Sequence, residues 1–405
     1  MCEAKRIVYL VGIGMGTLRG MTREAAELLE GCSCILGAKR LIAPFENGSV
    51  PCQALYQPEK IRAYLDGHPE LQTAGVVLSG DTGFYSGAKK LEETLSAAGY
   101  ELRRVPGISS VVYLAAALHV SWEDAALVSL HGRWQNWIYK VVHNARTFLL
   151  LGGDCAGERI GEKLRDYGLG EVTVSVGKNL SYPDEEIFSG KASELSEEDT
   201  KGLCVCCIEN PNWERYTAIH LPDEAFLRGN VPMTKEEVRT VCIAKLRLTK
   251  DAVLYDVGAG TGSVAIEAAL QGGGIRVYAI EKNPEGIGLI QKNAQKFRTD
   301  AVQTVEGNAP EALEGLEAPT HVFIGGSSGN LKEILRTVRA KNENVRIVLT
   351  AISLDTMAEV MEAVKTGLLR EPEIVQLSVA KSRKLGAHHM MTGQNPIYIV
   401  SEAEQ

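Results

Sequence analysis

The sequence predicts an α/β protein divided into roughly two or three domains. Two stretches share a pattern of apolar strand, glycine-rich turn and helix, one at residues 6–30 and the other at residues 252–270. Short apolar runs alternate with segments of helical composition over most of the remaining chain, which is typical of strands buried between helices. A chain of 405 residues is also too long for one typical hydrophobic core.

The clearest ligand-binding signal is the stretch from Tyr255 to Gly262, which reads Tyr-Asp-Val-Gly-Ala-Gly-Thr-Gly. The apolar run 252–255 before it suits a buried parallel strand, and residues 263–270 have helical composition. Three glycines between the two elements let the backbone turn sharply and let a ligand approach the main chain. The start of the helix adds free N–H donors to the same place.

The glycine spacing indicates which ligand this turn suits. A dinucleotide-binding turn needs its third glycine one residue later than Gly262, so the spacing argues against NAD. Glu281 ends the next apolar run, Arg276–Ile280, where a carboxylate can accept hydrogen bonds from ribose hydroxyls. The two features together favour a nucleoside-containing ligand other than a dinucleotide.

The first half of the chain has its own strand-end loops. A strand over Arg6–Val11 leads into a glycine turn, and Thr22 is placed to cap a helix that ends at Glu30. The strand Gly75–Leu78 ends in the loop Ser79–Tyr85, which contains Gly80 and Asp81. The strand Glu101–Val105 is stopped by a proline and a glycine, and Ser109 and Ser110 then start a helix. These features predict a second ligand-binding edge.

Further strands divide this half into two lobes. We place the division near residue 120, which gives lobes of about 1–120 and 121–210. The strands that we expect in the second lobe are Ala125–Leu130, Arg146–Leu151, Val172–Val176 and Leu203–Ile208. Cys204, Cys206 and Cys207 lie on the last of them, and their alternation across a strand favours core packing over metal binding. No metal site is predicted.

Residues 211–230 carry two prolines and no clear periodicity, so we interpret them as a linker to a domain over 231–405. A helix over Lys235–Leu246 is expected next, with Thr234 as its cap and Glu237 in capping-box register. The further strands expected in this domain are Arg276–Ile280, Val302–Glu306, His321–Ile324, Arg346–Thr350, Ile374–Ala380 and Pro396–Val400.

Composition narrows the class of protein. The formal net charge of −8 argues against a nucleic-acid partner, and no apolar run reaches the roughly 18 residues that a membrane-spanning helix needs. Nine cysteines form no regular framework, which suits free thiols in a reducing compartment. The first residues run straight into a strand without a secretory signal, so we expect a cytoplasmic location and, in addition, a homo-oligomer.

Four ordered motifs in the first half resemble the tetrapyrrole methylase family, and most closely its corrin-pathway branch that methylates carbon 5. The motifs are Gly12–Gly16, Ser79–Tyr85, Pro106–Ser110 and Val128–Arg133. The second half resembles the decarboxylating carbon-15 methyltransferases of the same pathway, which have a Rossmann-like class I fold. The motifs there are Pro232–Lys235, Asp256–Gly262, Gly307–Pro310 and Gly325–Ser327. The resemblance implies one chain that methylates carbons 5 and 15 of a precorrin in cobalamin biosynthesis.

The same resemblance implies S-adenosylmethionine as the cofactor and assigns its contacts. In the second domain the assigned residues are Thr234, Asp256, Gly258, Ala259, Gly260, Thr261, Gly262, Glu281, Asn308 and Ala309. In the first domain they are Gly80, Asp81, Ser109 and Ser110. The first domain would methylate carbon 5, and the second would methylate carbon 15 and remove the carboxyl group of an acetate arm.

A precorrin carries several carboxylates, so Arg, Lys or His side chains are expected to bind it. The candidates are Lys39, Arg40, His131, Arg133 and Arg383. Methyl transfer from a sulfonium needs mainly alignment of two partners, so no catalytic triad is expected, and no acid–base pair is assigned. Two other functions stay open: an NAD-dependent oxidoreductase, and a protein that binds a tetrapyrrole without converting it. Whether the substrate contains cobalt, and which methylation comes first, also stay open.

Overall fold

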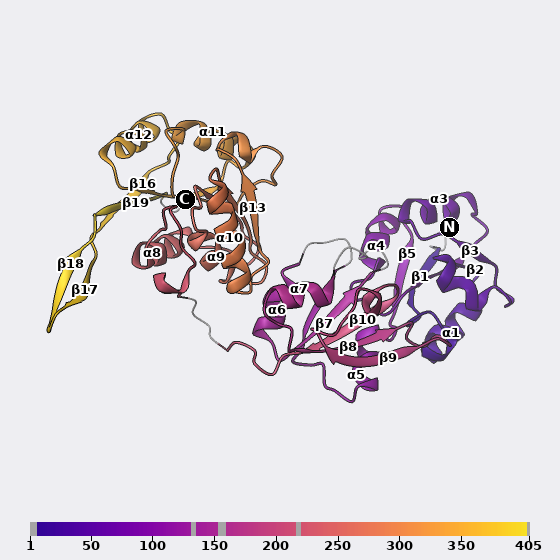
Figure 1. Cartoon of the computed structure of the whole chain (residues 1–405). Coiled ribbons are helices and arrows are strands. Elements are labelled where there is room, and N and C mark those ends of the chain that lie inside the picture. The colour runs from indigo at the N-terminus through magenta and orange to yellow at the C-terminus, as the bar shows by residue number, and fades with distance from the viewer. Residues whose placement is uncertain (1–5, 131–134, 153–158, 216–219, 403–405) are drawn as a thin grey trace. The chain divides into compact units, whose positions relative to one another are not determined.

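A computed structural model describes residues 6–130, 135–152, 159–215 and 220–402 of the chain (Figure 1). The chain forms two compact units. The first comprises Met1–Trp134, Asn144–Lys163 and Glu171–Pro211, and the second comprises Gln135–His143, Leu164–Gly170 and Asn212–Gln405. Among the described residues, every helix is too short or too polar to cross a lipid bilayer. Each unit is described by itself below.

The first unit opens with a wholly parallel sheet in the order β3-β2-β4-β1-β5. Its strands are β1 (Ile7–Gly12), β2 (Cys34–Gly37), β3 (Cys52–Ala54), β4 (Thr73–Leu78) and β5 (Glu101–Val105). The helices that accompany it are α1 (Arg23–Glu30), α2 (Lys39–Ile42), α3 (Pro58–Gly67), α4 (Ala88–Ser96) and α5 (Ser110–Ala117), with 3-10 turns at Leu18–Gly20 and Ala43–Phe45. Apolar side chains of α1 and α2 pack in one cluster and those of α3 and α4 in another, so both faces of the sheet are covered.

Three loops at the carboxyl ends of these strands touch through their backbones. A Cβ atom added at Gly107 would lie 2.3 Å from the carbonyl oxygen of Gly80 and 2.5 Å from the backbone of Gly12. Gly14 and Gly80 form an isolated β-bridge, in which the Gly80 N–H donates to the Gly14 carbonyl at 2.6 Å. The turn after β1 is therefore fixed against the loops after β4 and β5.

A second sheet completes the first unit, in the order β6-β7-β10-β8-β9. Its strands are β6 (Ala126–Ser129), β7 (Arg146–Leu151), β8 (Thr173–Lys178), β9 (Glu186–Lys191) and β10 (Cys204–Glu209). Only β6 and β7 are parallel. The chain between these strands also forms α6 (Trp137–His143), α7 (Ile160–Asp166) and a 3-10 turn at Glu198–Thr200. The predicted core packing of Cys204, Cys206 and Cys207 is confirmed, since all three are buried in β10.

The second unit is built on a seven-stranded sheet in the order β13-β12-β11-β14-β15-β19-β16. Its strands are β11 (Val253–Val257), β12 (Arg276–Glu281), β13 (Val302–Glu306), β14 (His321–Ile324), β15 (Arg346–Ala351), β16 (Pro372–Leu377) and β19 (Ile397–Glu402). Strands β11 to β15 are parallel, and β19 runs antiparallel to β15 and β16. The predicted α/β fold class is confirmed.

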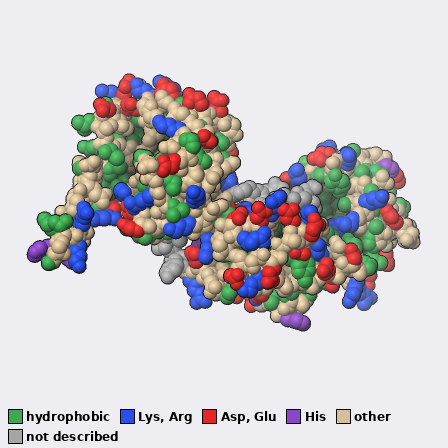
Figure 2. Space-filling view, viewed as in Figure 1, with side chains coloured by type: hydrophobic (Ala, Val, Ile, Leu, Met, Phe, Trp, Pro, Cys, Tyr) green, Lys and Arg blue, Asp and Glu red, His purple; other side chains and the backbone are tan. Residues whose placement is uncertain are grey.

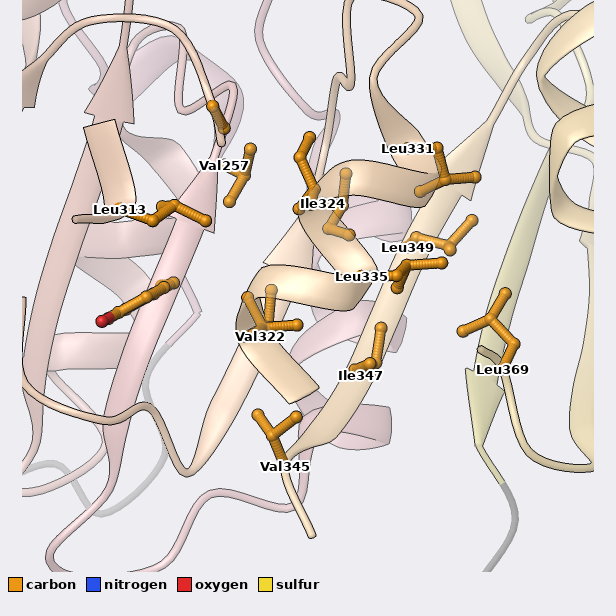
Figure 3. Close-up of a cluster of buried hydrophobic side chains, with 14 of the residues drawn as sticks. Val257, Leu313, Val322, Ile324, Leu331, Leu335, Val345, Ile347, Leu349 and Leu369 are labelled. Atoms are coloured by element: carbon orange, nitrogen blue, oxygen red, sulfur yellow. The ribbon is translucent and has the colours of Figure 1, made fainter. Parts of the chain in front are cut away.

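Helices cover both faces of this sheet. They are α8 (Glu236–Leu246), α9 (Ser263–Ala269), α10 (Pro284–Lys296), α11 (Leu331–Lys341) and α12 (Leu354–Lys365), with 3-10 turns at Asp223–Ala225 and Glu311–Leu313. Figure 3 shows the cluster in which Leu331 and Leu335 of α11 pack over Val322, Ile324 and other sheet residues. A separate cluster joins α8, α9 and α10 to the opposite face. The strand order reverses between β11 and β14. This switch point creates the crevice, at the carboxyl ends of the strands, where open α/β sheets bind ligands.

A two-stranded hairpin projects from the second unit, formed by β17 (Ala380–Leu385) and β18 (His388–Gly393) (Figures 1 and 2). Apart from Lys381 at its base, every residue of its two strands is exposed. The predicted strand Ile374–Ala380 overlaps β16, but the two strands of the hairpin were not predicted. Polar and charged residues are the majority in both strands together, so no apolar run marked them in the sequence.

The cap expected at Thr22 is confirmed, because its side chain accepts from the N–H of Ala25, and Ser109 caps α5 in the same way by accepting from the N–H of Val111. The cap predicted at Thr234 was wrong. Lys235 occupies the cap position of α8, and its side chain makes no capping bond. Strands β3 and β9 were not predicted, since each has a mostly exposed or half-exposed pattern without an apolar run.

Candidate active sites

The second unit has a cavity of about 210 Å³ at the switch point of its sheet. Residues from the carboxyl ends of β11, β12, β13 and β14 line it, together with Pro232 from the segment before α8. Five of the residues assigned to the cofactor lie in this lining: Gly258, Gly260, Glu281, Asn308 and Ala309. The structure therefore brings together five segments that are separate in the sequence.

The glycine turn leaves no room for side chains. Gly258, Gly260 and Gly262 all have positive φ angles, between 56° and 77°. A Cβ atom at Gly260 would lie 2.2 Å from the carbonyl oxygen of Pro232, and one at Gly258 would lie 2.8 Å from that of Gly326. Backbone thus forms the wall of the cavity on this side, as the glycine spacing predicts.

Glu281 fixes the turn and faces the cavity. One carboxylate oxygen accepts from the N–H of Gly260 at 2.8 Å, and the other accepts from the N–H of Asn283 at 2.8 Å. A carboxylate has about four acceptor positions, so both oxygens retain capacity for a ligand. Hydroxyl groups of a ribose are suitable donors for them.

Asp256 lies behind the turn, outside the cavity lining. Its Oδ2 atom accepts from the N–H of Ala265 at 2.9 Å, and within the described residues Oδ1 has no hydrogen-bond partner. Burial raises the pKa of this carboxyl to about 7, an effect that the Ala265 N–H reduces and the charge of Glu281 increases. Asp256 anchors the start of α9 and keeps one oxygen for a further donor.

Thr234, Ala259, Thr261 and Gly262 also lie outside the cavity lining. Ala259 donates its N–H to the Ile280 carbonyl, which holds the turn against β12. Thr261 is buried, and within the described part of the chain its hydroxyl has no partner. These residues shape the turn from behind.

Several lining residues were not assigned from the sequence. Lys282 follows Glu281, and its ammonium group donates to the hydroxyl of Ser328 at 2.8 Å across the edge of the sheet. Gly325, Gly326, Ser327 and Ser328 form the opposite wall after β14. The motif Gly325–Ser327 of the sequence covers three of these four residues, although no ligand contact was assigned to it.

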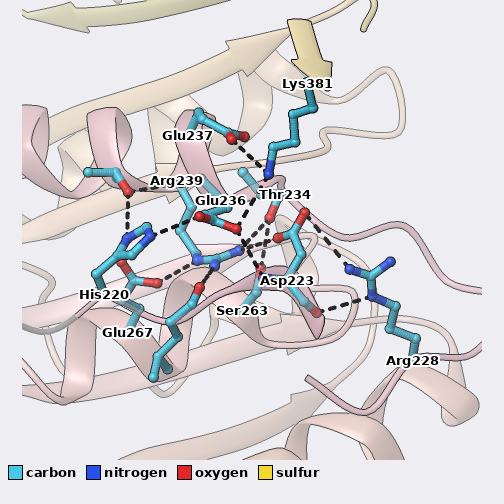
Figure 4. Close-up of polar contacts among 12 residues, drawn as sticks. His220, Asp223, Arg228, Thr234, Glu236, Glu237, Arg239, Ser263, Glu267 and Lys381 are labelled. Atoms are coloured by element: carbon cyan, nitrogen blue, oxygen red, sulfur yellow. Dashed lines mark hydrogen bonds and ion pairs between the residues drawn. The ribbon is translucent and has the colours of Figure 1, made fainter. Parts of the chain in front are cut away.

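A buried arginine ties the segment before α8 to the sheet domain (Figure 4). Arg239 is 0% exposed, and it donates to Glu267 at 2.6 Å and to Asp223 at 3.2 Å. It also donates to the backbone carbonyls of Leu221 and Thr234. The Thr234 carbonyl accepts in addition from the hydroxyl of Ser263 in α9, at 3.4 Å. Arg239 thereby holds the chain on both sides of Pro232, which lines the cavity.

The first unit has a cavity of about 320 Å³ that residues from both of its sheets line. The loops after β1, β4 and β5 supply Met15, Gly80, Ser109 and Ser110, among others. The second sheet and its loops supply Leu150, Leu151, Leu180, Cys204 and Val205. Three of the four residues assigned to a cofactor in this unit therefore line one cavity.

Asp81, the fourth residue, links two of these loops. Its carboxylate accepts from the N–H of Gly83 at 2.8 Å and from that of Gly107 at 3.0 Å. It lines a neighbouring apolar cavity of about 290 Å³, which shares Ser109 and Phe84 with the first. Asp81 thus fixes the geometry of the loops whatever ligand they bind.

The side chains that were predicted to bind the substrate carboxylates lie in different surroundings. Arg40 lines the larger cavity and donates to the Met15 carbonyl at 2.9 Å and to the Tyr182 hydroxyl at 3.0 Å. Lys39 is exposed and Arg383 lies on the hairpin, and neither lines a cavity described above. His131 and Arg133 lie outside the described residues. Arg40 alone among the described candidates is placed at a cavity.

Comparison with known proteins supports two catalytic domains. Residues 7–196 match the family profile described as Tetrapyrrole (Corrin/Porphyrin) Methylases, and residues 224–403 match the Precorrin methyltransferase domain. Both profiles describe methyltransferases. The chain is therefore a two-domain methyltransferase.

A relative of similar length identifies the family. The precorrin-6Y C(5,15)-methyltransferase [decarboxylating] of Sinorhizobium sp. is 30% identical over 97% of this chain and 94% of its own length. This chain belongs to the family of precorrin-6Y C5,15-methyltransferases (decarboxylating). A probable cobalt-precorrin-6B C(15)-methyltransferase (decarboxylating) of Pyrobaculum calidifontis is 41% identical over 46% of this chain and 96% of its own length. A crystal structure of a precorrin-6Y C5,15-methyltransferase from Geobacter metallireducens matches 45% of this chain and 95% of its own at 39% identity, with a TM-score of 0.43.

Replacement of Arg239 by methionine should destabilise the second unit by roughly 3–5 kcal/mol, because Glu267 would remain buried without its partner and Asp223 would keep only its longer contact to Arg228. Denaturant unfolding measures the change. Arg228→Met is the matched control, since Arg228 reaches Asp223 from a 44% exposed position and its loss should cost less than about 1 kcal/mol. Equal losses in the two variants would contradict the role given to the buried arginine.

Asp256 should make the stability of the second unit depend on pH. Its pKa is raised from 3.8 to about 7, so between these values the folded chain keeps a proton that the unfolded chain has released. Stability should therefore fall as the pH rises from about 4 to about 7. Asp256→Asn should remove a decline of roughly 4 kcal/mol, measured by denaturant unfolding across this range.

The exposed Asp251 offers a matched control in the same domain. Asp251→Asn should keep the decline, because the Asp256 carboxyl is intact in that variant. A wild-type profile that Asp256→Asn does not alter would show that the Asp256 carboxyl titrates normally.

Proposed function

We propose that this chain methylates carbons 5 and 15 of a precorrin or cobalt-precorrin and removes the carboxyl group of one acetate arm, in cobalamin biosynthesis. S-adenosylmethionine supplies an electrophilic methyl group to each site when it is bound. The observation that supports the proposal best is the presence of two cavities, each lined by glycine loops at the carboxyl ends of parallel strands. Two separate cofactor sites agree with two methylations.

In the second domain, the residues of the cavity fit the cofactor in chemical type. Glu281 offers acceptors for ribose hydroxyls, and the backbone of Gly258 and Gly260 allows close approach. The unpartnered Oδ1 of Asp256 suits the amino group of the methionine portion, whose positive charge would favour the ionised carboxylate. Asn308 and Ala309 would lie beside the adenine. Thr234 remains a proposed contact, since it does not serve as a helix cap.

In the first domain, Gly80, Ser109 and Ser110 are proposed to contact the cofactor, while Asp81 fixes the loops that carry them. Arg40 is proposed to bind a carboxylate of the substrate at the same cavity. Its guanidinium group has five N–H donors, and the contacts to Met15, Tyr182 and Ser79 leave others available.

Both methylations require alignment of an electron-rich ring carbon with the methyl group, and exclusion of water. Positioning of this kind can contribute roughly 7–11 kcal/mol, so residues that only bind and orient can account for much of the rate. Removal of the acetate carboxyl breaks a carbon–carbon bond, releases carbon dioxide and moves the electron pair into the conjugated macrocycle. A proton then adds to the remaining carbon to form a methyl group. We assign this step to the second domain.

We propose further that residues 1–210 form the carbon-5 domain, residues 211–230 the linker and residues 231–405 the carbon-15 domain, in a cytoplasmic homo-oligomer. The hairpin supports an oligomer, because an isolated two-stranded ribbon is marginal in water and this one exposes Leu385, Met390 and Met391. Light scattering of the full chain measures its molecular mass in solution, and a monomer would contradict this part of the proposal.

Calorimetric titration with S-adenosylhomocysteine should show two sites per chain. Glu281→Ala should weaken the site of the second domain by roughly tenfold or more, because hydrogen bonds to a charged acceptor contribute about 1.5–3 kcal/mol. Glu306→Ala is the control. Glu306 lies opposite Glu281 in the register of β12 and β13, and it is exposed and outside the cavity lining. A single site per chain that Glu281→Ala abolishes would contradict the proposal of two centres.

Turnover tests the function itself. Incubation with a precorrin and methyl-labelled S-adenosylmethionine should give a product with two labelled methyl groups and one carboxyl group fewer, measured by mass spectrometry. Neither NAD nor NADH should be required. Tetrapyrrole binding without product would favour a carrier, and nicotinamide-dependent conversion without label would favour an oxidoreductase.

A further inference from the structure

A second cavity lies beside the cofactor cavity of the second unit and has no role so far. Its volume is about 350 Å³, and it is lined by the loop Gly325–Gly329 after β14 and by residues 350–353 after β15, with Thr356 and Glu359 of α12. The two cavities share four residues: Gly325, Gly326, Ser327 and Ser328. The two cavities therefore adjoin along this short loop.

Two large exposed apolar side chains lie at the lining of this cavity or next to it in the sequence. Ile352 lines the cavity with 65% of its surface exposed, and Leu354, two residues later at the start of α12, is 80% exposed. Neither belongs to the core clusters of the unit. We call Ile352 and Leu354 the apolar ledge. The apolar ledge offers an apolar contact surface to a ligand that enters the cavity.

The polar groups of the cavity are uncharged on the loop side. Ser327 and Ser328 belong to the shared wall, and Ser328 accepts from the ammonium group of Lys282 at 2.8 Å. Glu359 lies in α12, which follows β15. In the sheet order β15 is farther than β14 from β12, the strand that Lys282 follows. A ligand with carboxylates would therefore direct them toward Lys282 and away from Glu359.

A tetrapyrrole matches these features. Its ring face is broad and apolar, its edge carries carboxylate arms, and the carbon to be methylated must lie next to the bound cofactor. Ligands of this size bind in largely apolar clefts that have a few polar groups to fix their orientation. A cavity that adjoins the cofactor cavity and ends in an apolar ledge fits a broad ring. No acidic residue directly follows β15 in its lining, so it lacks the strand-end carboxylate that would bind the ribose of a second nucleoside.

We propose that the cavity between the Gly325–Gly329 loop and α12 is the macrocycle subsite of the second domain, and that the ring rests on the apolar ledge. The inference rests on the proposed function, because it takes the tetrapyrrole from there. It adds the residues that bind the macrocycle. Ile352 and Leu354 make apolar contact with the ring, and Lys282, which contacts Ser328 of the loop, attracts its carboxylates.

The double variant Ile352→Ser with Leu354→Ser tests the subsite in the full chain. Both side chains are exposed, so the thermal unfolding temperature should stay unchanged. The KM for the precorrin in the decarboxylating methylation should rise about tenfold or more, because the ring would lose apolar contact with two side chains. The affinity for S-adenosylhomocysteine, measured by calorimetry, should remain within about twofold of the wild type.

Ile374→Ser is the matched control. Ile374 is an exposed isoleucine of β16, at the edge of the same sheet and outside both cavities. It should alter neither KM nor cofactor affinity. A raised KM in this control would show that loss of any exposed apolar group has the same effect, which would overturn the assignment.

The remaining outcomes separate the two proposals. A wild-type enzyme that methylates precorrin, with a double variant of unchanged KM, would refute the subsite and leave the proposed function intact. Loss of S-adenosylhomocysteine affinity in the double variant would place the ledge in the cofactor site instead, and would also refute the subsite. A wild-type protein that transfers no methyl group to a precorrin would refute the proposed function itself.

Discussion

Direct contact between backbone segments at the carboxyl ends of the strands is the constraint on which both cavities depend. In the first unit, Gly107 packs against Gly80 and Gly12 at distances that no Cβ atom could occupy. In the second unit, Gly260 packs in the same way against the Pro232 carbonyl. Loops that touch through their main chains cannot shift independently. The cavities between them are consequently shaped by backbone, and the side chains that face a ligand are few.

This constraint explains why charged groups are buried near the second cavity. Pro232 must stay close to Gly260, yet the segment 221–234 that carries it has little regular structure. Arg239 compensates by binding two carbonyls of that segment and two carboxylates at once, and the bonds to the carboxylates are buried. A buried ion pair seldom adds much net stability over apolar packing, but it fixes one geometry when its hydrogen bonds are satisfied. Here the geometry that it fixes is the position of a cavity wall.

Sequence reasoning predicted the parts of the fold that have a strong local signal. Apolar runs located the central strands, and the strand-end glycines with Glu281 located the second cavity. What it missed depends on contacts between distant residues. Threonine is a common helix cap, but Arg239 binds the carbonyl of Thr234 and the helix starts one residue later than predicted. Lys282 and Ser328 meet across the edge of the sheet, 46 positions apart, and no local pattern reports such a pair.

The cysteines of β10 have a consequence for an enzyme that handles an alkylating reagent. A thiolate near a sulfonium methyl group would itself be methylated, since the thiolate is the nucleophilic form of cysteine. Cys204 lines the first cavity, and its sulfur donates to the carbonyls of Thr200 and Gly202, which requires the protonated thiol. Burial raises the pKa of Cys207 to about 12 and that of Cys206 well above its usual value. Cys204, the cysteine of β10 that lines the cavity, therefore presents a hydrogen-bonded thiol to it, while Cys206 and Cys207 outside the lining resist ionisation.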